Sequence, residues 1–160
     1  MKTHPMKVEG EFKLDDYALE KAVPYLLNRA GVRIGEAFSE ELVKFNLTLP
    51  MYRVLASLLR IDAQRMTHLA EYTSIDISTL SRLVAGMEKK GLVKREPGRK
   101  DKRSVHVMLQ EPGRDLVMRL APLADLYERV ALANITPDEV ATLKRLLIRI
   151  YDNIESLGSR

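Results

Sequence analysis

Apolar residues recur every three to four positions along most of the chain, which is the period of helices that bury one face. The first long run covers residues 24–45, and Pro24 suits its first turn because the amide that proline lacks has no partner there. We expect its buried face to contain Leu26, Leu27, Ala30, Ile34, Ala37, Phe38 and Leu42. A second helix is predicted from residue 49 onward, before a polar connection over residues 60–65, with a buried stripe of Tyr52, Leu55, Ala56 and Leu59.

Residues 67–72 and 77–90 are predicted to form two further helices joined by a short turn. Asp76 can accept hydrogen bonds from the free amides that open the second of them, while Ile75 and Leu80 are spaced to pack together across its start. Gly91 follows two lysines and suits a left-handed C-cap. The pattern therefore predicts a helix-turn-helix.

The apolar pattern then changes to alternation. Residues 92–95 and 104–109 are candidate strands, and the Pro97–Gly98 pair between them marks a turn, so we expect a two-stranded hairpin with a charged tip. A long helix over residues 112–133 follows, bent at Pro122. Its core candidates are Leu116, Leu120, Leu123, Tyr127 and Val130.

The last helix has the clearest predicted start. Thr136 can act as N-cap, Pro137 suits the first helical position, and Glu139 completes a capping box. The apolar residues that follow recur every three or four positions, close to the heptad spacing of a coiled coil: Val140, Leu143, Leu147, Ile150, Ile154 and Leu157. Such a stripe can be core within one chain, but we interpret it as a helical interface shared by two chains.

Composition excludes several classes of protein. The 160 residues are 46% hydrophobic and 30% charged, and no apolar run approaches the roughly 20 residues that cross a bilayer. The N-terminal residues do not resemble a secretory signal, so we expect a cytoplasmic location without membrane contact. There is no cysteine, and His4, His68 and His106 are scattered, so neither a metal nor a cofactor is expected. Nor does any nucleophile with a suitably spaced base indicate an enzyme.

Charge is concentrated in one segment. Residues 82–103 contain nine basic and three acidic residues, whereas the rest of the chain contains 17 basic and 19 acidic residues. A helix-turn-helix places its second helix in the major groove, and a basic hairpin beside it could grip phosphates or enter the minor groove. Our predicted DNA contacts are Ser78, Thr79, Ser81, Arg82, Lys89, Arg95, Arg99, Lys100, Asp101, Lys102 and Arg103. We assign Asp101 to holding a neighbouring arginine, because an acid would repel DNA.

This central part of the chain resembles the MarR-type winged-helix transcription regulators. The resemblance runs from Leu69–Ala70 through ISTLSRLVAGMEKKGLVKRE to DKRSVHVML and Gly113, and the triplet at residues 101–103 is similar to the family's Asp-x-Arg wing motif. One departure is Leu109–Gln110, where the family often has Leu-Thr, so the next helix must be capped differently.

The resemblance implies a mainly α (α+β) fold: a winged helix-turn-helix with N- and C-terminal dimerisation helices and a two-stranded wing. We place the N-terminal dimerisation region at residues 1–49, the DNA-binding lobe at residues 50–110 and the C-terminal dimerisation helices at residues 111–160. The expected partners are a second copy of the chain, a pseudo-palindromic double-stranded DNA operator and a small-molecule effector that relieves repression. The alternative is a winged-helix protein-interaction module that does not read DNA.

The effector is the least determined partner. Arg29 and Arg33 lie one turn apart on the first helix, and with Tyr52 they could receive a carboxylate or phosphate on an aromatic body. Family members similar to this chain respond to phenolic acids or their coenzyme A thioesters, which suggests the same class here. Alternatively, Arg33 pairs with Glu36, Arg29 faces water and Tyr52 belongs to the core.

Overall fold

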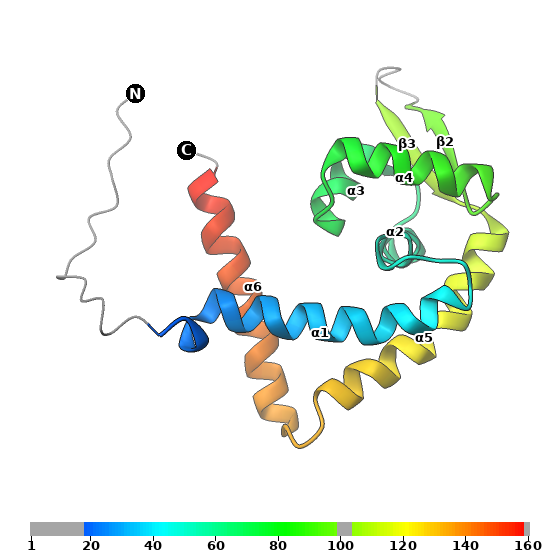
Figure 1. The fold of residues 1–160 in the computed structure, drawn as a ribbon. Helices are drawn as coiled ribbons and strands as arrows, with labels where there is room; N and C mark the ends of the chain where they lie inside the picture. Colours follow the sequence, from blue (N-terminus) through cyan, green and yellow to red (C-terminus); the bar gives the residue numbers. More distant parts are fainter. Residues whose placement is uncertain (1–17, 99–103, 159–160) are drawn as a thin grey trace, which may run out of the picture.

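The computed structural model describes residues 18–98 and 104–158. After a short 3-10 helix (Leu19–Lys21), the helices are α1 (Val23–Val43), α2 (Leu49–Arg60), α3 (Met66–Thr73), α4 (Ile77–Lys89), α5 (Glu111–Ala131) and α6 (Pro137–Gly158). The strands are β1 (Gln64–Arg65), β2 (Val93–Pro97) and β3 (Val105–Leu109). The predicted mainly α fold with a winged helix-turn-helix is confirmed, and each predicted helix is present (Figure 1).

Helix α2 lies at the centre of the compact lobe, with α4 and the sheet on one side of it and α1 on the other (Figure 1). Because neighbours surround α2, its burial extends beyond one stripe. Leu55 is fully buried as predicted, but Tyr52, Ala56 and Leu59 are only partly buried. The prediction missed Val54 and Leu58, which the structure buries.

Helices α3 and α4 form the predicted helix-turn-helix. Asp76 caps α4 as expected, since its Oδ1 accepts the backbone N–H of Thr79 at 2.9 Å. Leu80, Val84 and Met87 are buried and fix one face of α4 against the core. The opposite face of α4 is therefore free for contact with another molecule.

The three strands form an antiparallel sheet in the order β1-β3-β2. Strand β1 was not predicted, because its two residues are too few to show an alternating pattern. It lies in the stretch that we expected to be a plain connection. Gly91 has φ +70°, which confirms the left-handed C-cap between α4 and β2. The hairpin thus leaves the lobe directly beside the end of α4.

Helix α5 packs along α1 and α2 before leaving the lobe. Gln110 is its N-cap and makes no side-chain capping bond, in line with the departure from the family pattern noted above. Leu120 is buried as predicted, but Val130 is 66% exposed and the prediction missed Val117, which is buried. Pro122 lies inside the helix.

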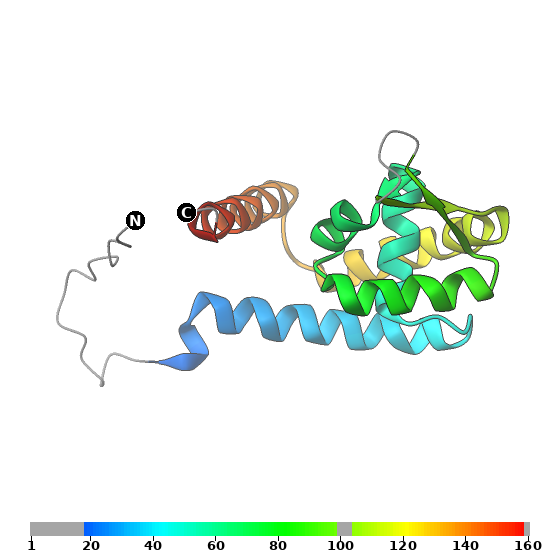
Figure 2. The same ribbon diagram turned by 90° about the horizontal axis from the view of Figure 1, so that it is seen from above.

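The capping box of α6 is confirmed. The Thr136 N–H donates to Glu139 Oε2 at 2.8 Å, and the Glu139 N–H reaches Thr136 Oγ1 at 3.4 Å. Every described side chain of α6 from residue 141 onward is exposed, including its apolar stripe. Helix α6 and the first half of α1 lie apart from the compact lobe (Figure 2). No helix in the described ranges carries a stretch long and apolar enough to span a membrane.

Candidate DNA-binding surface and ligand groove

The outer face of α4 brings together the polar residues that the sequence assigns to DNA. Ser78, Thr79, Ser81, Arg82 and Lys89 are all exposed on the side away from the buried apolar stripe. In Figure 1 this helix runs across the molecule beside the hairpin. Among the described residues, no carboxylate forms an ion pair with Arg82 or Lys89. Their charges are therefore available to an anionic partner.

The first turn of α4 is tied together by Asp76. The Ser78 hydroxyl donates to Asp76 Oδ1 at 2.7 Å, and the Arg82 Nη2 donates to Thr79 Oγ1 at 3.5 Å. Hydrogen bonds from Ser78 and from Thr79 hold the pKa of the Asp76 carboxyl well below its usual range. These contacts order the turn that presents Ser78, Thr79 and Arg82 to solvent.

Arg95, another predicted DNA contact, is exposed but forms an intramolecular ion pair with Glu88. Its Nε and Nη2 lie 2.9 and 2.7 Å from Glu88 Oε2, and its backbone N–H donates to Glu88 Oε1 at 2.8 Å. The hydrogen bonds and charge of Arg95 lower the pKa of the Glu88 carboxyl. Sequence reasoning missed Glu88, because an acid within a basic segment gave no indication of which cation it meets.

Two further basic residues near α4 also have internal partners. Lys90 Nζ donates to the Asn46 carbonyl at 3.0 Å, which ties the end of α4 to the loop between α1 and α2. Lys94 pairs with Glu96 at 2.7 Å. The net charge of residues 82–103 thus overstates the number of basic side chains on this face that lack an intramolecular partner.

Five predicted DNA contacts lie outside the described residues: Arg99, Lys100, Asp101, Lys102 and Arg103. Strands β2 and β3 lead to them, and the Gly98 N–H donates to the Ser104 carbonyl at 2.8 Å where the described part of the hairpin ends.

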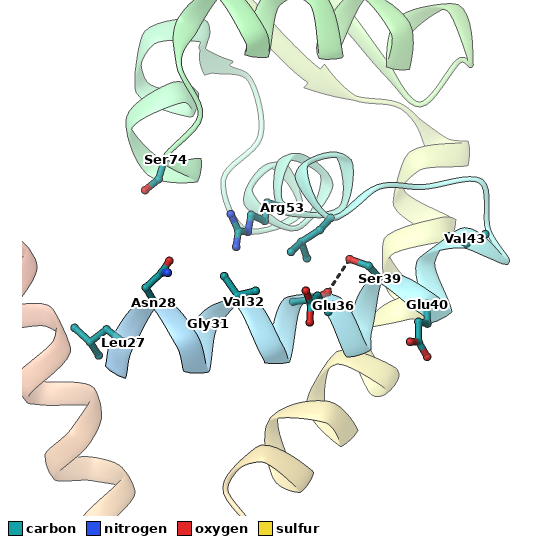
Figure 3. Close-up of a pocket in the computed structure, with 12 residues that line it drawn as sticks. Leu27, Asn28, Gly31, Val32, Glu36, Ser39, Glu40, Val43, Arg53 and Ser74 are labelled. Carbon is teal, nitrogen blue, oxygen red and sulfur yellow. Dashed lines mark hydrogen bonds between the residues drawn. The ribbon is translucent and has the colours of Figure 1, made fainter. Parts of the chain in front are cut away.

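A groove of about 1090 Å³ runs between α1 and α2 and reaches the turn before α4 (Figure 3). Asn28, Arg53 and Ser74 point into one end of it, over Gly31. A methyl group added at Gly31 would meet no atom within 4 Å, so this glycine leaves the groove open. The rest of the lining combines the apolar side chains of Leu27, Val32, Val43 and Leu49 with the polar side chains of Glu36, Ser39 and Glu40.

The structure does not bring the three predicted effector residues together. The Arg29 guanidinium lies 5.5 Å from the centre of the Tyr25 ring, and Arg33, 84% exposed, pairs with Glu36 at 3.5 Å. Tyr52 packs edge-on against Phe38 with ring centres 4.9 Å apart.

The groove's cation is instead Arg53, which the sequence prediction missed. Arg53 and Ser74 line both the groove and a second hollow of about 550 Å³ that Tyr52 and Tyr72 border. Within the described residues, no carboxylate pairs with Arg53. No sequence signal distinguishes Arg53 from other exposed arginines, because the groove forms only when α1, α2 and the turn meet.

The described residues contain no cluster of three histidine, aspartate or glutamate side chains that could hold a metal ion.

Comparison with known proteins identifies the family. The model of the MarR family matches residues 47–105. A transcriptional regulator of the MarR family from Silicibacter pomeroyi has a crystal structure that is similar to this chain with a TM-score of 0.80 and 31% sequence identity. The match covers 89% of this chain and 97% of that one. The chain belongs to the MarR family of transcriptional regulators.

Two other relatives of this MarR-family chain are similar over most of their length. The transcriptional repressor IacR of Pseudomonas putida is 26% identical over 97% of this chain and 90% of its own. BpsR of Bordetella bronchiseptica, whose DNA binding is regulated by 6-hydroxynicotinic acid, has a TM-score of 0.78 at 26% identity, covering 85% of this chain and 97% of that one. Members of this family are transcription regulators and not enzymes.

Proposed function

We propose that this chain is a homodimeric DNA-binding repressor that a small organic acid, or its coenzyme A thioester, releases from a pseudo-palindromic operator. The observation that carries the proposal is the outer face of α4, where hydroxyl groups stand with Arg82 and Lys89 beside the basic hairpin. An arginine can reach base edges and phosphates in the major groove, while the hydroxyls add supporting contacts. We assign Arg99, Lys100, Lys102 and Arg103 to phosphate or minor-groove contact, and Asp101 to holding one of these arginines.

The apolar surface of α6 supports the dimer. Leu143, Leu147, Ile150 and Ile154 are between 37% and 64% exposed, on one stripe of a helix whose described residues include none that is buried. The first half of α1 adds Val23 and Leu26, which are also exposed. A second copy of the chain would cover these surfaces, and it would set two α4 helices for successive major grooves of one duplex face.

Binding to the double-stranded DNA that flanks the gene for this protein tests the proposal. Arg82→Ala should weaken binding by about tenfold or more, since an arginine contact to a base contributes on the order of 1–3 kcal/mol. Arg33→Ala is the matched control, because Arg33 belongs to α1, a helix that lies across α2 from α4 (Figure 1), and this variant should bind as the wild type does. Equal affinity of Arg82→Ala and wild type would refute the role of α4. The absence of any salt-dependent binding would favour the protein-interaction module.

The groove at Arg53 is the effector site that the geometry favours. The guanidinium can take a carboxylate in two parallel hydrogen bonds, with Asn28 and Ser74 beside it to donate more. Glu36 also lines the groove, but Arg33 neutralises it. Glu40 also lines the groove, but it is twelve residues, or about 18 Å, along α1 from Asn28.

The groove also connects the two functions of the protein. One wall is α1, the proposed dimerisation helix, and Ser74 belongs to the turn that leads into α4. A ligand that contacts both walls would favour one spacing of the two α4 helices, and a spacing that mismatches the groove repeat of the duplex lowers operator affinity.

Ligand-induced thermal stabilisation tests this site, with 6-hydroxynicotinate and 4-hydroxybenzoate as probes. Arg53→Met should abolish the stabilisation because it removes the cation at similar length, and Gly31→Leu should abolish it by filling the groove. Arg29→Met serves as the control, because Arg29 lies over the Tyr25 ring and does not line the groove, and it should respond as the wild type does. Loss of the response in Arg29→Met but not in Arg53→Met would overturn the assignment and favour the pair Arg29 and Arg33.

A further inference from the structure

Two carboxylates bind backbone amides of the two long strands of the wing, one in the middle of β2 and one at the end of β3 that adjoins α5. Glu88, near the end of α4, accepts the backbone N–H of Arg95 in β2 at 2.8 Å. Asp62, in the turn after α2, accepts the backbone N–H of Leu109 in β3, also at 2.8 Å. A bond to a backbone amide fixes the strand itself and not only a side chain, so each carboxylate acts directly on the path of its strand.

Both bonds lie where the sheet leaves an amide without a ladder partner. Strand β2 is an edge strand, and Glu88 takes the outward N–H of Arg95. Strand β1 pairs with β3 only at Val107 and His106, so the Leu109 amide lies beyond it, where Asp62 takes the position of a strand residue. Each carboxylate thus accepts a hydrogen bond from an amide that no neighbouring strand pairs.

Each carboxylate is itself held in place. Glu88 forms the two-nitrogen contact with the Arg95 guanidinium described above, at 2.9 and 2.7 Å. Asp62 accepts the Ala63 N–H at 2.8 Å through Oδ1, and its Oδ2 lies 3.8 Å from Arg114 Nη2 at the start of α5. The wing is therefore fixed to α4 on one side and to the junction of α2 and α5 on the other.

The orientation of a strand at one end determines where its other end lies. A five-residue strand spans about 17 Å, so a tilt of about 10° at its root moves its far end by about 3 Å, the length of one ion-pair contact. Phosphate contacts require that the strands and α4 meet the duplex together.

We propose that Glu88 and Asp62 are positioning residues that set the angle of the wing relative to α4, so that both elements engage one DNA duplex. This inference rests on the proposed DNA-binding function. It assigns Arg95 to the positioning contact with Glu88 in place of the direct DNA contact predicted from the sequence.

The salt dependence of DNA binding separates positioning from direct contact. Glu88→Gln and Arg95→Lys each break the two-nitrogen ion pair, and Arg95→Lys keeps the positive charge. If Glu88 and Arg95 position the wing, both variants should bind about tenfold more weakly, and the slope of log affinity against log salt should fall by about 0.9 for each phosphate that the wing no longer neutralises. Asp62→Asn should lower the slope in the same direction through β3.

Glu71→Gln provides the charge-matched control. Glu71 is exposed on α3, and its replacement removes the same negative charge as Glu88→Gln, so by charge alone both variants should bind DNA as tightly as the wild type or more tightly. Weaker binding by Glu88→Gln alone, in protein that circular dichroism shows to be folded at the assay temperature, supports positioning. If Glu88→Gln does not fold, the same comparison is made with Arg95→Lys.

Three results overturn the inference in distinguishable ways. If the wild type binds DNA and Glu88→Gln matches Glu71→Gln in affinity and slope, positioning is refuted while the proposed function stands. Tighter binding by Glu88→Gln with little change in Arg95→Lys would show instead that a released Arg95 contacts phosphate directly. If the wild type does not bind DNA at any salt concentration, the proposed function and this inference fail together.

Discussion

Gly113 marks the closest approach of α5 to the residue that leads into the wing. A Cβ atom at this position would lie 2.2 Å from the Leu92 carbonyl oxygen and 3.0 Å from its carbon, both of which are backbone atoms. The same carbonyl accepts the Gln110 N–H at 3.0 Å, so the two segments are also joined by a hydrogen bond. Only glycine allows this contact without a shift of the backbone.

We therefore expect Gly113→Ala to lower the free energy of unfolding by about 3 kcal/mol, since overpacking against backbone cannot be relieved by a rotamer change. Gly31→Ala is the contrasting control. Its Cβ would meet nothing within 4 Å, and alanine favours the helical state, so it should raise stability by about 0.5–1 kcal/mol. Urea denaturation of the two variants measures both changes. A similar effect of the two substitutions would contradict the packing described for Gly113.

Some single-residue roles could be read from the sequence and others could not. The cap at Asp76, the left-handed Gly91 and the capping box at Thr136 depend on neighbours within a few positions, and the structure confirms all three. The partners of Arg95 and Lys90 depend on how distant segments meet. A basic run shows that cations are present, but only the fold shows which of them are already paired.

At the scale of the elements, three carboxylates stabilise helix ends and the wing. Hydrogen bonds from Ser78 and Thr79 lower the pKa of Asp76 at the start of α4. Those from Arg95 lower the pKa of Glu88 near its end, and those from Thr136 lower the pKa of Glu139 at the start of α6. Each carboxylate therefore favours the folded state in its ionised form.

These three carboxylates make the stability of the folded chain depend on pH. Because these pKa values are lower in the folded chain than the ordinary values of 3.8 for aspartate and 4.5 for glutamate, the contribution is complete above about pH 5 and is lost as the pH falls below the unfolded values. We expect the urea midpoint to fall between pH 5 and pH 3. Asp76→Asn, which keeps a capping side chain but does not titrate, should show a smaller fall. An equally steep loss in Asp76→Asn would contradict the role of the Asp76 carboxylate.

Helices were predictable as elements because their apolar periodicity extends over many residues, but burial within them was less so. On α1, Phe38 and Leu42 are buried as expected, whereas Leu26 and Ile34 remain 47% and 44% exposed. The apolar periodicity shows that a helix has an apolar face, but it does not show which part of this chain or of another molecule covers that face. In the single chain Leu26 and Ile34 stay open to solvent, which is one reason to infer a second copy.

At the scale of the whole molecule, the charge concentration and the family resemblance indicated the DNA-binding lobe, but no comparable sequence signal indicated the candidate groove at Arg53. Asn28, Arg53 and Ser74 come from α1, α2 and the turn before α4, and no spacing rule links them. The sequence prediction placed the effector on Arg29, Arg33 and Tyr52 because they lie beside apolar residues. The fold turns Arg33 outward to Glu36 and places Arg53 at the groove instead.

The proposed dimer would account for both the exposed apolar stripe of α6 and the free face of α4, because it would present two α4 helices to one side of a duplex. Hydroxyl-radical footprinting of the wild-type protein on the DNA flanking its own gene tests this most directly. We predict two protected segments on the same face, related by an inverted repeat, with centres about one helical turn or 34–36 Å apart. A single protected segment without such a partner, or no protection at low salt, would contradict the account.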